Sequence, residues 1–452
     1  MKFAFSDFQR ALCLSVMLVS HLAKAQTTNV APQPIDLATV LRLAGAQNLD
    51  IQIARERLKE AEANRTSALE QFFPWLAPGV SYHRRDGLAQ SVPSGVISDA
   101  NFQSYSPGAT IGAQMDLGDA IYKSLAAKQL VKASDQGLAA QRQDSALSAA
   151  QGYFDLAKAA MLAEVNREAR KTSQDYQQQL HVAVGSGIAF KGDELRVQSQ
   201  TDHYDITLQQ TLEQQRVVAA NLARLLHLDA TVELVPADKE LLPLTLVETN
   251  VAMDVLVGQA LKSRPELKQS QALLAAARAT KNGAVYGPLV PSIGAQAFGG
   301  GLGGGPDNGH STFGGEGDVS VGLSWRIGPG GLFDSGRINA SKARMAATQL
   351  GGEKLKDDIT AQVVTAFVRV QSLGNQIAMA TRNLATANDT LRLTRERKQY
   401  GVGIVLEDIQ AQQDLTQARS DYFTAIAEFN KAQYDLNKAV GGTPEGSLSG
   451  QH

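Results

Sequence analysis

The chain has 452 residues, 43% of them hydrophobic and 19% charged, a composition typical of a folded protein and not of a disordered one. Its 43 basic and 45 acidic residues nearly cancel, and the net charge of −2 excludes the strong positive field that recruits nucleic acid. We therefore expect no nucleic-acid partner. A single cysteine, Cys13, excludes a disulfide framework.

The N-terminal segment has the pattern of a secretory signal. Lys2 and Arg10 precede an apolar core over residues 11–19, and the small-residue sequence AKA ends at Ala25. After this segment, no stretch reaches the roughly 18–20 consecutive apolar residues of a membrane-spanning helix. We expect an exported chain with a signal peptide over residues 1–25 that is not a helical membrane protein.

The chain repeats one plan in two halves. The segment HVAVGSGIAF around Gly185 is echoed by KQYGVGIVLE around Gly401, and FFPWLAPGV around Pro74 is echoed by PLVPSIGAQ around Pro291. Repeated marks in the same order at nearly the same spacing indicate an internal duplication. The predicted divisions are a signal peptide (1–25), a first structural repeat (26–228), a linker or equatorial segment (229–250), a second repeat (251–441) and a flexible tail (442–452).

Long helices dominate both repeats. Apolar residues recur in alternating steps of 4 and 3 over residues 359–391 and again over 415–439, a period of 3.5 that predicts coiled-coil packing. The predicted helix over 333–400, with Gly351 and Gly352 as its candidate break, would be about 100 Å long. A plain coiled-coil spacer is the simpler alternative, but it leaves the strands described next unexplained.

Four segments alternate between apolar and polar residues, over 76–82, 109–117, 293–297 and 318–327. Alternation of period 2 predicts strands with one apolar and one polar face, as in a membrane β-barrel. In the last segment, Trp325 would face lipid and Arg326 the lumen. We expect the glycine-rich and polar stretches 84–103 and 299–317 to be loops at the outer surface.

Four strands cannot close a barrel, because the smallest closed barrels use about eight strands and an open edge is not tolerated in hydrocarbon. Two chains would make an 8-stranded barrel filled by side chains, and three would make a 12-stranded barrel wide enough for a channel. A soluble two-sheet sandwich is the alternative for these strands, although four strands are few for it.

No pattern of residues indicates catalysis. The seven histidines are scattered, without metal-ligand spacing to cysteine or to one another. Gly299, Gly301 and Gly304 have the spacing of a dinucleotide-binding loop, but no buried strand precedes them and no helix follows, so we interpret them as part of a flexible loop. We predict no enzyme, no catalytic or metal-binding residue and no cofactor.

Two glycine pairs are predicted to reverse the long helices. Gly185 and Gly187 in the first repeat, and Gly401 and Gly403 in the second, interrupt the helical patterns where the chain must turn back. Glycine adopts the positive φ values that such turns require.

Acidic residues begin both returning helices. Asp193 and Glu194 follow the first turn, and Glu407 and Asp408 follow the second. Carboxylates at helix starts are favoured by the helix dipole and by capping, which is one interpretation. The other is that several copies, brought together at a narrow mouth, form an acidic ring that favours cations and helps to hold an entrance shut.

From about Asp36 to Gly442, the chain resembles the TolC family of outer-membrane channel proteins. The resemblance rests on the duplicated helix-strand-strand-helix-turn-helix plan, the two glycine turns and the run YGVGIVLEDIQAQQDLTQARSDYFTAIAEFNKAQYDL, which contains Tyr400, Gly403 and Asp408. It implies a mixed, mainly α fold: a homotrimer with a 12-stranded transmembrane β-barrel and a periplasmic α-barrel of long coiled-coil helices.

The resemblance also implies partners and a location. The channel would lie in the outer membrane of a Gram-negative bacterium, in contact with outer-membrane lipid, and extend into the periplasm. Its partners would be a periplasmic adaptor (membrane fusion protein) and an inner-membrane transporter that supplies the energy.

In this family, the helix turns form the periplasmic tip, where adaptors dock and the tunnel narrows. The turns here are residues 184–192 and 401–405. The residues assigned to tip turns and adaptor contact are Gly185, Gly187, Gly401, Val402 and Gly403. The residues assigned to the periplasmic tip or gate are Asp193, Glu194, Tyr400, Glu407 and Asp408.

The function that follows is a passive exit duct of a tripartite efflux system, which passes small molecules or drugs to the exterior. A type I protein-secretion duct is the alternative within the channel class. From a different class, a periplasmic structural coiled-coil protein without a channel would also use the long helices. The two classes differ at the strands, because only a channel requires lipid-facing apolar sides.

Overall fold

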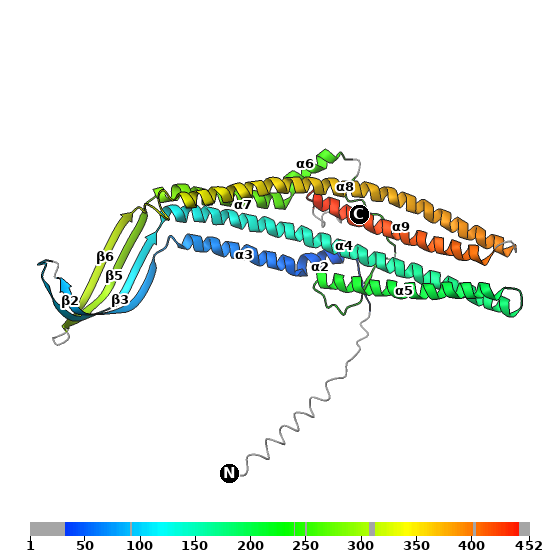
Figure 1. Cartoon of the computed structure of the whole chain (residues 1–452), viewed down its shortest axis with the longest axis horizontal. Helices are drawn as coiled ribbons and strands as arrows, with labels where there is room; N and C mark the ends of the chain where they lie inside the picture. The colour runs from blue at the N-terminus through cyan, green and yellow to red at the C-terminus, as the bar shows by residue number, and fades with distance from the viewer. Residues whose placement is uncertain are drawn as a thin grey trace, which may run out of the picture.

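In the computed structural model, the described residues are 32–90, 93–238, 240–248, 251–306, 312–400 and 404–442. The predicted signal peptide lies outside these ranges, as do the tail beyond residue 442 and the turn residues Gly401, Val402 and Gly403. The described chain is elongated, with a four-stranded sheet at one end and long helices extending from it (Figure 1).

The first half of the chain contains β1 (Gln33–Ile35), α2 (Leu37–Gln47), α3 (Leu49–Glu70), β2 (Trp75–Gln90), β3 (Ile97–Met115), α4 (Leu117–Gly185) and α5 (Lys191–Leu225). The second half contains β4 (Leu234–Pro236), α6 (Met253–Ser263), α7 (Pro265–Tyr286), the 3₁₀ helix η1 (Gly287–Leu289), β5 (Ser292–Pro306), β6 (Thr312–Ser324), α8 (Ser335–Gln399) and α9 (Val405–Ala439). The predicted fold class, mainly α with long helices and four long strands in a duplicated plan, is confirmed.

The two longest helices carry the length of the molecule. Helix α4 has 69 residues and α8 has 65, so each spans about 100 Å at 1.5 Å per residue. The candidate break at Gly351 and Gly352 is absent, because α8 continues through both residues. Glycine inside a helix costs only about 1 kcal/mol, which the packing of a long helix offsets. Within the described ranges, no helix combines the length and apolar character needed to cross a membrane.

The shorter helices lie end to end along the long ones (Figure 1). Where α3 meets the end of α5, Asn48 Nδ2 donates to the Leu225 carbonyl oxygen at 3.1 Å. Where α7 meets the end of α9, Ser263 Oγ donates to the Val440 carbonyl oxygen at 2.8 Å, and Arg264 Nη1 donates to that of Ala439 at 3.4 Å. In both halves, a side chain between two helices thus satisfies carbonyls that a helix end leaves open.

Alanine and aromatic side chains form the core between the helices. Ala149 and Ala150 of α4 and Ala427 of α9 are fully buried, and Phe154 and Tyr434 lie beside them with ring centroids 5.8 Å apart. Small residues allow the helices to approach closely, while the rings fill the wider space near the middle of the molecule.

The linker between the repeats is tied to α9 by two fully buried amide side chains. Asn430 Nδ2 donates to the Leu242 carbonyl oxygen at 2.9 Å, and Asn430 Oδ1 accepts from the Leu244 N–H at 2.7 Å. Gln433 Oε1 accepts from the N–H groups of Leu246 and Val247. These bonds satisfy backbone groups of a segment that has no strand partner there.

The four-stranded sheet has the order β2-β3-β5-β6, and all its neighbours are antiparallel. The strands are longer than predicted, because most of the stretches 84–103 and 299–317 belong to strands and not to loops. The fourth strand ends at Ser324, so the predicted strand positions of Trp325 and Arg326 were wrong, and residue 117 begins α4.

The prediction of a loop at the glycines of β5 was wrong, because aromatic rings of other strands cover these glycines and stabilise a strand. A Cβ placed on Gly301 would lie 2.3 Å from the Phe313 ring, and one on Gly303 would lie 2.4 Å from the Tyr105 ring. Rings over glycine stabilise such strands by filling the space that a missing side chain leaves. A glycine-rich stretch is therefore a strand here.

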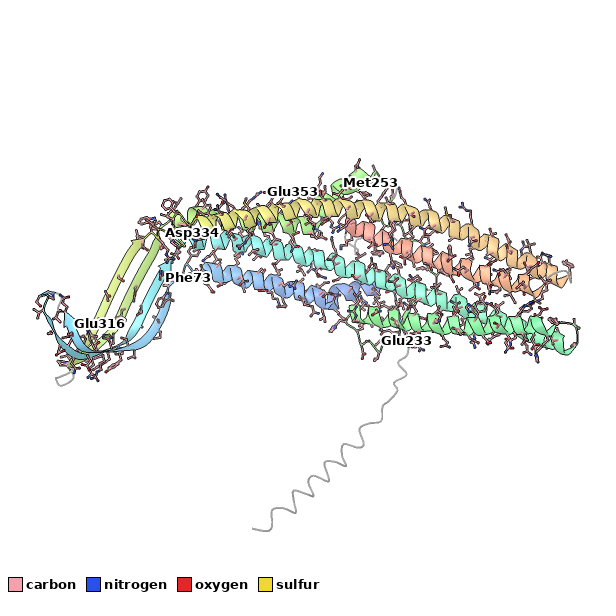
Figure 2. All side chains as sticks on the ribbon, in the orientation of Figure 1. Phe73, Glu233, Met253, Glu316, Asp334 and Glu353 are labelled. Atoms are coloured by element: carbon pink, nitrogen blue, oxygen red, sulfur yellow. The ribbon has the colours of Figure 1, made fainter. Side chains whose placement is uncertain are left out.

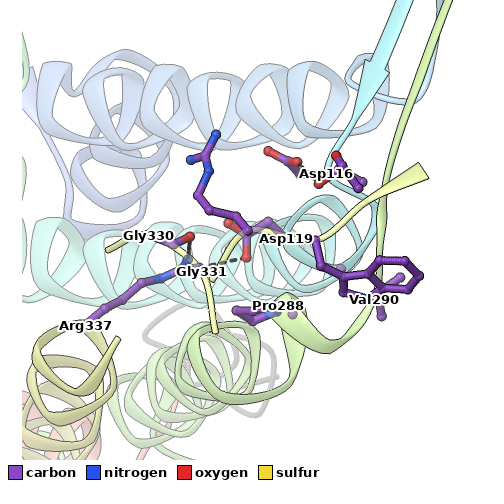
Figure 3. Close-up of a pocket in the computed structure, with 13 residues that line it drawn as sticks. Asp116, Asp119, Pro288, Val290, Gly330, Gly331 and Arg337 are labelled. Carbon is purple, nitrogen blue, oxygen red and sulfur yellow. Dashed lines mark hydrogen bonds and ion pairs between the residues drawn. The ribbon is translucent and has the colours of Figure 1, made fainter. Parts of the chain in front are cut away.

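The sheet joins the helices through a compact junction (Figures 2 and 3). Arg337 Nη2 donates to Asp119 Oδ1 at 2.7 Å, which links the starts of α8 and α4 across the two repeats. Asp334 caps α8 through the Arg337 N–H and also accepts from the Gly330 N–H at 2.8 Å. The junction therefore sets how the strands leave the helices.

Candidate functional site

The sheet has one apolar and one polar face, because the register aligns the four alternating patterns. Directly paired residues include Leu76 with Ile111, Ile111 with Ala297, and Ala297 with Val319. Paired residues of neighbouring strands point to the same side of a sheet. All four predicted apolar sides thus form a single continuous face, which we call the outer face.

Aromatic residues mark one end of the outer face. Tyr82 pairs with Tyr105, Tyr105 pairs with Gly303, and Gly303 pairs with Phe313, so these residues form one row across the sheet. The rings of Tyr105 and Phe313 are stacked with centroids 6.0 Å apart. Tyr and Trp are enriched where the hydrocarbon of a bilayer meets water.

The outer face is apolar below this row and polar above it. Leu323 lies near the opposite end of β6 from Phe313, and Trp325 follows just after the strand ends. The roughly ten residues between them, at about 3.3 Å each and a strand tilt of about 40°, correspond to an apolar band about 25 Å tall. Beyond the row, Arg84 and Asp86 occupy the same face. The outer face therefore has the height of an outer-membrane lipid band.

The turn between α4 and α5 forms the first part of the predicted tip. Gly187 has φ of 74° and ends the helical pattern, while Gly185 is the last residue of α4. The Ile188 N–H bonds back to the Ala183 carbonyl oxygen at 2.9 Å, which closes the turn. Ile188 and Phe190 are exposed at 83% and 74%.

Tyr400 ends α8 at the second turn and is exposed at 83%. The following residues, Gly401 to Gly403, lie outside the described ranges, so the structure describes only the two sides of this turn. The returning helix α9 begins at Val405. The described part of the tip thus presents large apolar side chains to solvent.

The four acidic residues all contact basic groups of the same chain. Glu194 is 7% exposed, and its carboxylate accepts from Lys191 Nζ at 2.7 Å and contacts His181 Nδ1 at 2.9 Å. The hydrogen bond from Lys191, followed by that from His181, lowers the pKa of Glu194 below its usual value. Asp193 contacts Arg196 at 3.3 Å on the helix surface.

Asp408 is 8% exposed and lies between two cations of α8. Lys398 Nζ is 3.7 Å from Asp408 Oδ2, and Arg395 Nε is 3.8 Å from Asp408 Oδ1. By contrast, Glu407 contacts Arg397 at 3.2 Å in a more exposed position. The adjacent carboxylates at the start of α9 therefore have different environments.

Lys398 connects the two helical hairpins. Its Nζ lies 3.5 Å from the centroid of the Tyr176 ring, which belongs to α4. Burial lowers the pKa of Lys398, while Asp408 acts in the opposite direction. Burial also raises the pKa of the Tyr176 hydroxyl, so Tyr176 stays neutral. The group Asp408, Lys398 and Tyr176 joins α9 to α4 through α8.

Sequence reasoning missed Tyr176, Arg395 and Lys398 because their partners lie on other helices. The sequence shows only that basic residues end α8; which carboxylate they contact depends on how the hairpins pack. In the described residues, no group of three or more His, Cys, Asp and Glu side chains is placed to hold a metal ion.

Known proteins with this architecture are outer-membrane channels. The structure superimposes on the Campylobacter jejuni CmeC outer membrane channel with a TM-score of 0.76 at 16% identity, over 90% of this chain and 85% of that one. The outer membrane protein VceC of Vibrio cholerae gives 0.73 at 17% identity, over 90% and 96%. The Neisseria gonorrhoeae MtrE outer membrane channel, in its open state, gives 0.70 at 19% identity, over 90% and 89%.

Sequence comparisons agree with the fold. Residues 256–442 match the family described as outer membrane efflux protein. Nodulation protein T of Rhizobium leguminosarum bv. trifolii is 23% identical over 427 residues, which cover 88% of this chain and 83% of the relative.

The chain therefore has the fold of TolC-like outer-membrane channels, and residues 256–442, in its second half, match the outer membrane efflux family. The predicted location in the outer membrane is confirmed by the same findings. This class is not enzymatic, which confirms the prediction of a conduit instead of an enzyme.

Proposed function

We propose that three copies of this chain form one channel, the passive exit duct of a tripartite efflux system. The observation that carries the proposal is the continuous apolar outer face, about 25 Å tall and bounded by aromatic residues. Exposing such an apolar face to water costs free energy, whereas contact with lipid does not. A coiled-coil spacer without a channel would not require an exposed apolar face.

The free edges of the sheet support closure by other copies. Strands β2 and β6 are the edges of the described sheet, and a single chain leaves both unpaired. In hydrocarbon, each unpaired N–H or C=O costs several kcal/mol, so β6 of one copy would pair with β2 of the next. Three copies supply twelve strands, enough for an aqueous bore.

The tip is proposed as the docking and gating end. Ile188, Phe190 and Tyr400 are large, apolar and exposed, as expected of residues that a periplasmic adaptor covers. The same end carries Glu194 and Asp408, which are held by basic groups within the chain. An inner-membrane transporter would supply the energy, as the resemblance to the TolC family implies.

The paired acids refine the proposed acidic ring. Because Asp193, Glu194, Glu407 and Asp408 each have a basic partner, three copies do not simply add twelve free negative charges. We propose that the Asp408–Lys398–Tyr176 contact holds the two hairpins of each chain together at the entrance, and that opening the entrance breaks it.

The test is the mass of the protein extracted in mild detergent from isolated outer membranes, measured by light scattering with the detergent contribution subtracted. Three chains per particle, together with single-channel currents after reconstitution in planar bilayers, are the expected result. Release from the membrane without detergent, or a monomer after gentle extraction, would contradict the channel and favour the structural coiled-coil protein.

A further inference from the structure

The second face of the sheet, which we call the inner face, lines the bore if the proposed trimer closes. The register places Phe298 on this face, directly paired with Thr110 on one side and Asp318 on the other. The next inward-facing row consists of Gly79, Gly108, Gly300 and Glu316. These two rows lie near the middle of the apolar band of the outer face.

Phe298 lies flat against the sheet because two glycines leave room for its ring. A Cβ placed on Gly108 would lie 2.5 Å from Cζ of Phe298, and one placed on Gly300 would lie 2.8 Å from the same atom. Real Cβ atoms do not approach carbon this closely, so an alanine at either position would displace the ring. It would also approach backbone: a Cβ on Gly300 would lie 2.4 Å from the Pro107 carbonyl oxygen, and one on Gly108 would lie 2.8 Å from that of Gly299. The two glycines thus expose one ring face to the bore.

Two carboxylates accompany this ring. Asp318 is directly opposite Phe298 on β6, and Glu316 is one inward-facing position further along the strand. Glu316 Oε2 accepts a hydrogen bond from Ser106 Oγ at 3.4 Å, so its side chain reaches across β5 above Gly300. The remaining residues of the two rows are small: Ala77, Gly79, Gly108, Thr110 and Gly300.

The basic groups of the inner face lie elsewhere. His83 and Arg85 of β2 share this face, but they pair with Ser104 and Phe102, two and three inward-facing positions beyond Gly79. Those stretches of strand correspond to about 13 and 20 Å, more than a Debye length at physiological salt. Within one chain, no described cation of these four strands therefore lies in the rows of Asp318 and Glu316.

We propose that Phe298, Asp318 and Glu316 form a lining that recognises flat organic cations as they pass through the barrel. The proposal rests on the proposed channel function and deepens it by naming a substrate class. An aromatic face attracts cations and stacks with flat rings, and carboxylates at the same depth add charge selectivity. In the trimer, three copies of each group would surround the bore.

The test uses ethidium as the probe cation and the purified trimer in planar bilayers. Ethidium is expected to reduce the potassium current, and its half-blocking concentration should rise about 5- to 30-fold in Phe298→Ala, the range that about 1–2 kcal/mol of cation–π attraction gives. The double variant Glu316→Gln with Asp318→Asn should show a rise of the same order. Phe313→Ala is the matched control, because the same residue type is removed from the outer face.

A second measurement tests the glycine floor. Gly108→Ala should lower the unitary conductance, because the displaced Phe298 ring narrows the bore. Adding Phe298→Ala should restore most of it, because only the 2.8 Å approach to the Gly299 carbonyl oxygen then remains. This rescue separates a narrowed bore from a misfolded barrel, which a second substitution would not repair.

The outcomes separate the two proposals. Suppose that the wild-type trimer passes current, but that ethidium blocks Phe298→Ala or the double carboxylate variant at the same concentration as the wild type. The recognition lining is then overturned, while the channel function stands. Equal block by a naphthalene sulfonate, an anion with a flat ring, would also overturn it. If no currents are seen with any form of the protein, the channel function itself fails.

Discussion

Asp408→Asn is the sharpest perturbation of the tip. The substitution removes the negative charge that lies 3.7 Å from Lys398 Nζ and 3.8 Å from Arg395 Nε. At an effective dielectric constant of about 20, one such pair is worth about 4 kcal/mol before desolvation. The side chains of Lys398 and Arg395 are 34% and 49% exposed, so in the variant their hydration replaces part of the lost electrostatic energy. We expect a net free-energy cost of about 1–2 kcal/mol, which lies between the cost of losing an exposed ion pair and that of losing a buried one.

The assay is hydrogen exchange of the backbone amides in 392–400 and 405–412. A local cost of about 1–2 kcal/mol should speed exchange there about 5- to 30-fold, because exchange follows the free energy of local opening. If the contact also closes the entrance, the unitary conductance should rise. The amides around the middle of α4 should be unaffected.

Glu407→Gln is the matched control. Glu407 contacts Arg397 at 3.2 Å, but its side chain is 40% exposed and that of Arg397 is 58% exposed. Exposed pairs contribute about 0–1 kcal/mol, so exchange should change by a factor of about five at most. Equal exchange rates in Asp408→Asn and the wild type would refute the claim that Asp408 holds the hairpins together.

Three further outcomes follow from the fold. Val319→Arg, near the middle of the outer face, should destabilise the proposed trimer in lipid by about 2–4 kcal/mol, because the charge would face hydrocarbon. Ser320→Arg on the inner face should be tolerated, and the heat resistance of the two variants in detergent tests the difference. Asn430→Ala should lower the free energy of unfolding in urea by about 2–4 kcal/mol, because two buried backbone groups lose their partners. The control Gln410→Ala, at an exposed position, should change this free energy by under about 0.5 kcal/mol. A loss as small as that for Asn430→Ala would contradict the role of the amide. Burial acts to raise the pKa of Glu428, but hydrogen bonds from two lysines outweigh it and hold the pKa below 4.5. Its stabilising contribution is full above that value and is lost as the pH falls through the lowered pKa. The urea midpoint of Glu428→Gln should therefore fall less than that of the wild type as the pH drops below 4.5, and parallel curves would count against this ion cluster.

The repeating patterns of the sequence were sufficient for the elements and their order. The 3.5-residue period over 359–391 predicts a long packed helix whatever the partner is, because a helix with one apolar stripe must cover it. Alternation over 318–327 likewise predicts a strand with two unlike faces. Both predictions depend on neighbouring residues in the chain, and both elements are present in the structure, although the strand already ends at Ser324.

Strand length was not predictable in the same way. Residues 299–306 are rich in glycine and read as a loop, yet Tyr105 and Phe313, from two other strands, cover Gly301 and Gly303. The side chains that cover a glycine in a sheet come from neighbouring strands, and the residues next to that glycine in the chain do not indicate them.

The sequence by itself determined the class of fold and the duplication, because these follow from periodicity and from repeated motifs in the same order. Only the tertiary structure decided the contacts on which the proposed gate and lining rest. Asp408 of α9 contacts Lys398 of α8, and Lys398 in turn contacts the ring of Tyr176, which belongs to α4 in the first half of the chain. Phe298 lies on the inner face because the register of β5 with β3 and β6 puts it there. Pairing between distant segments is set by packing of the whole chain, which no local pattern contains.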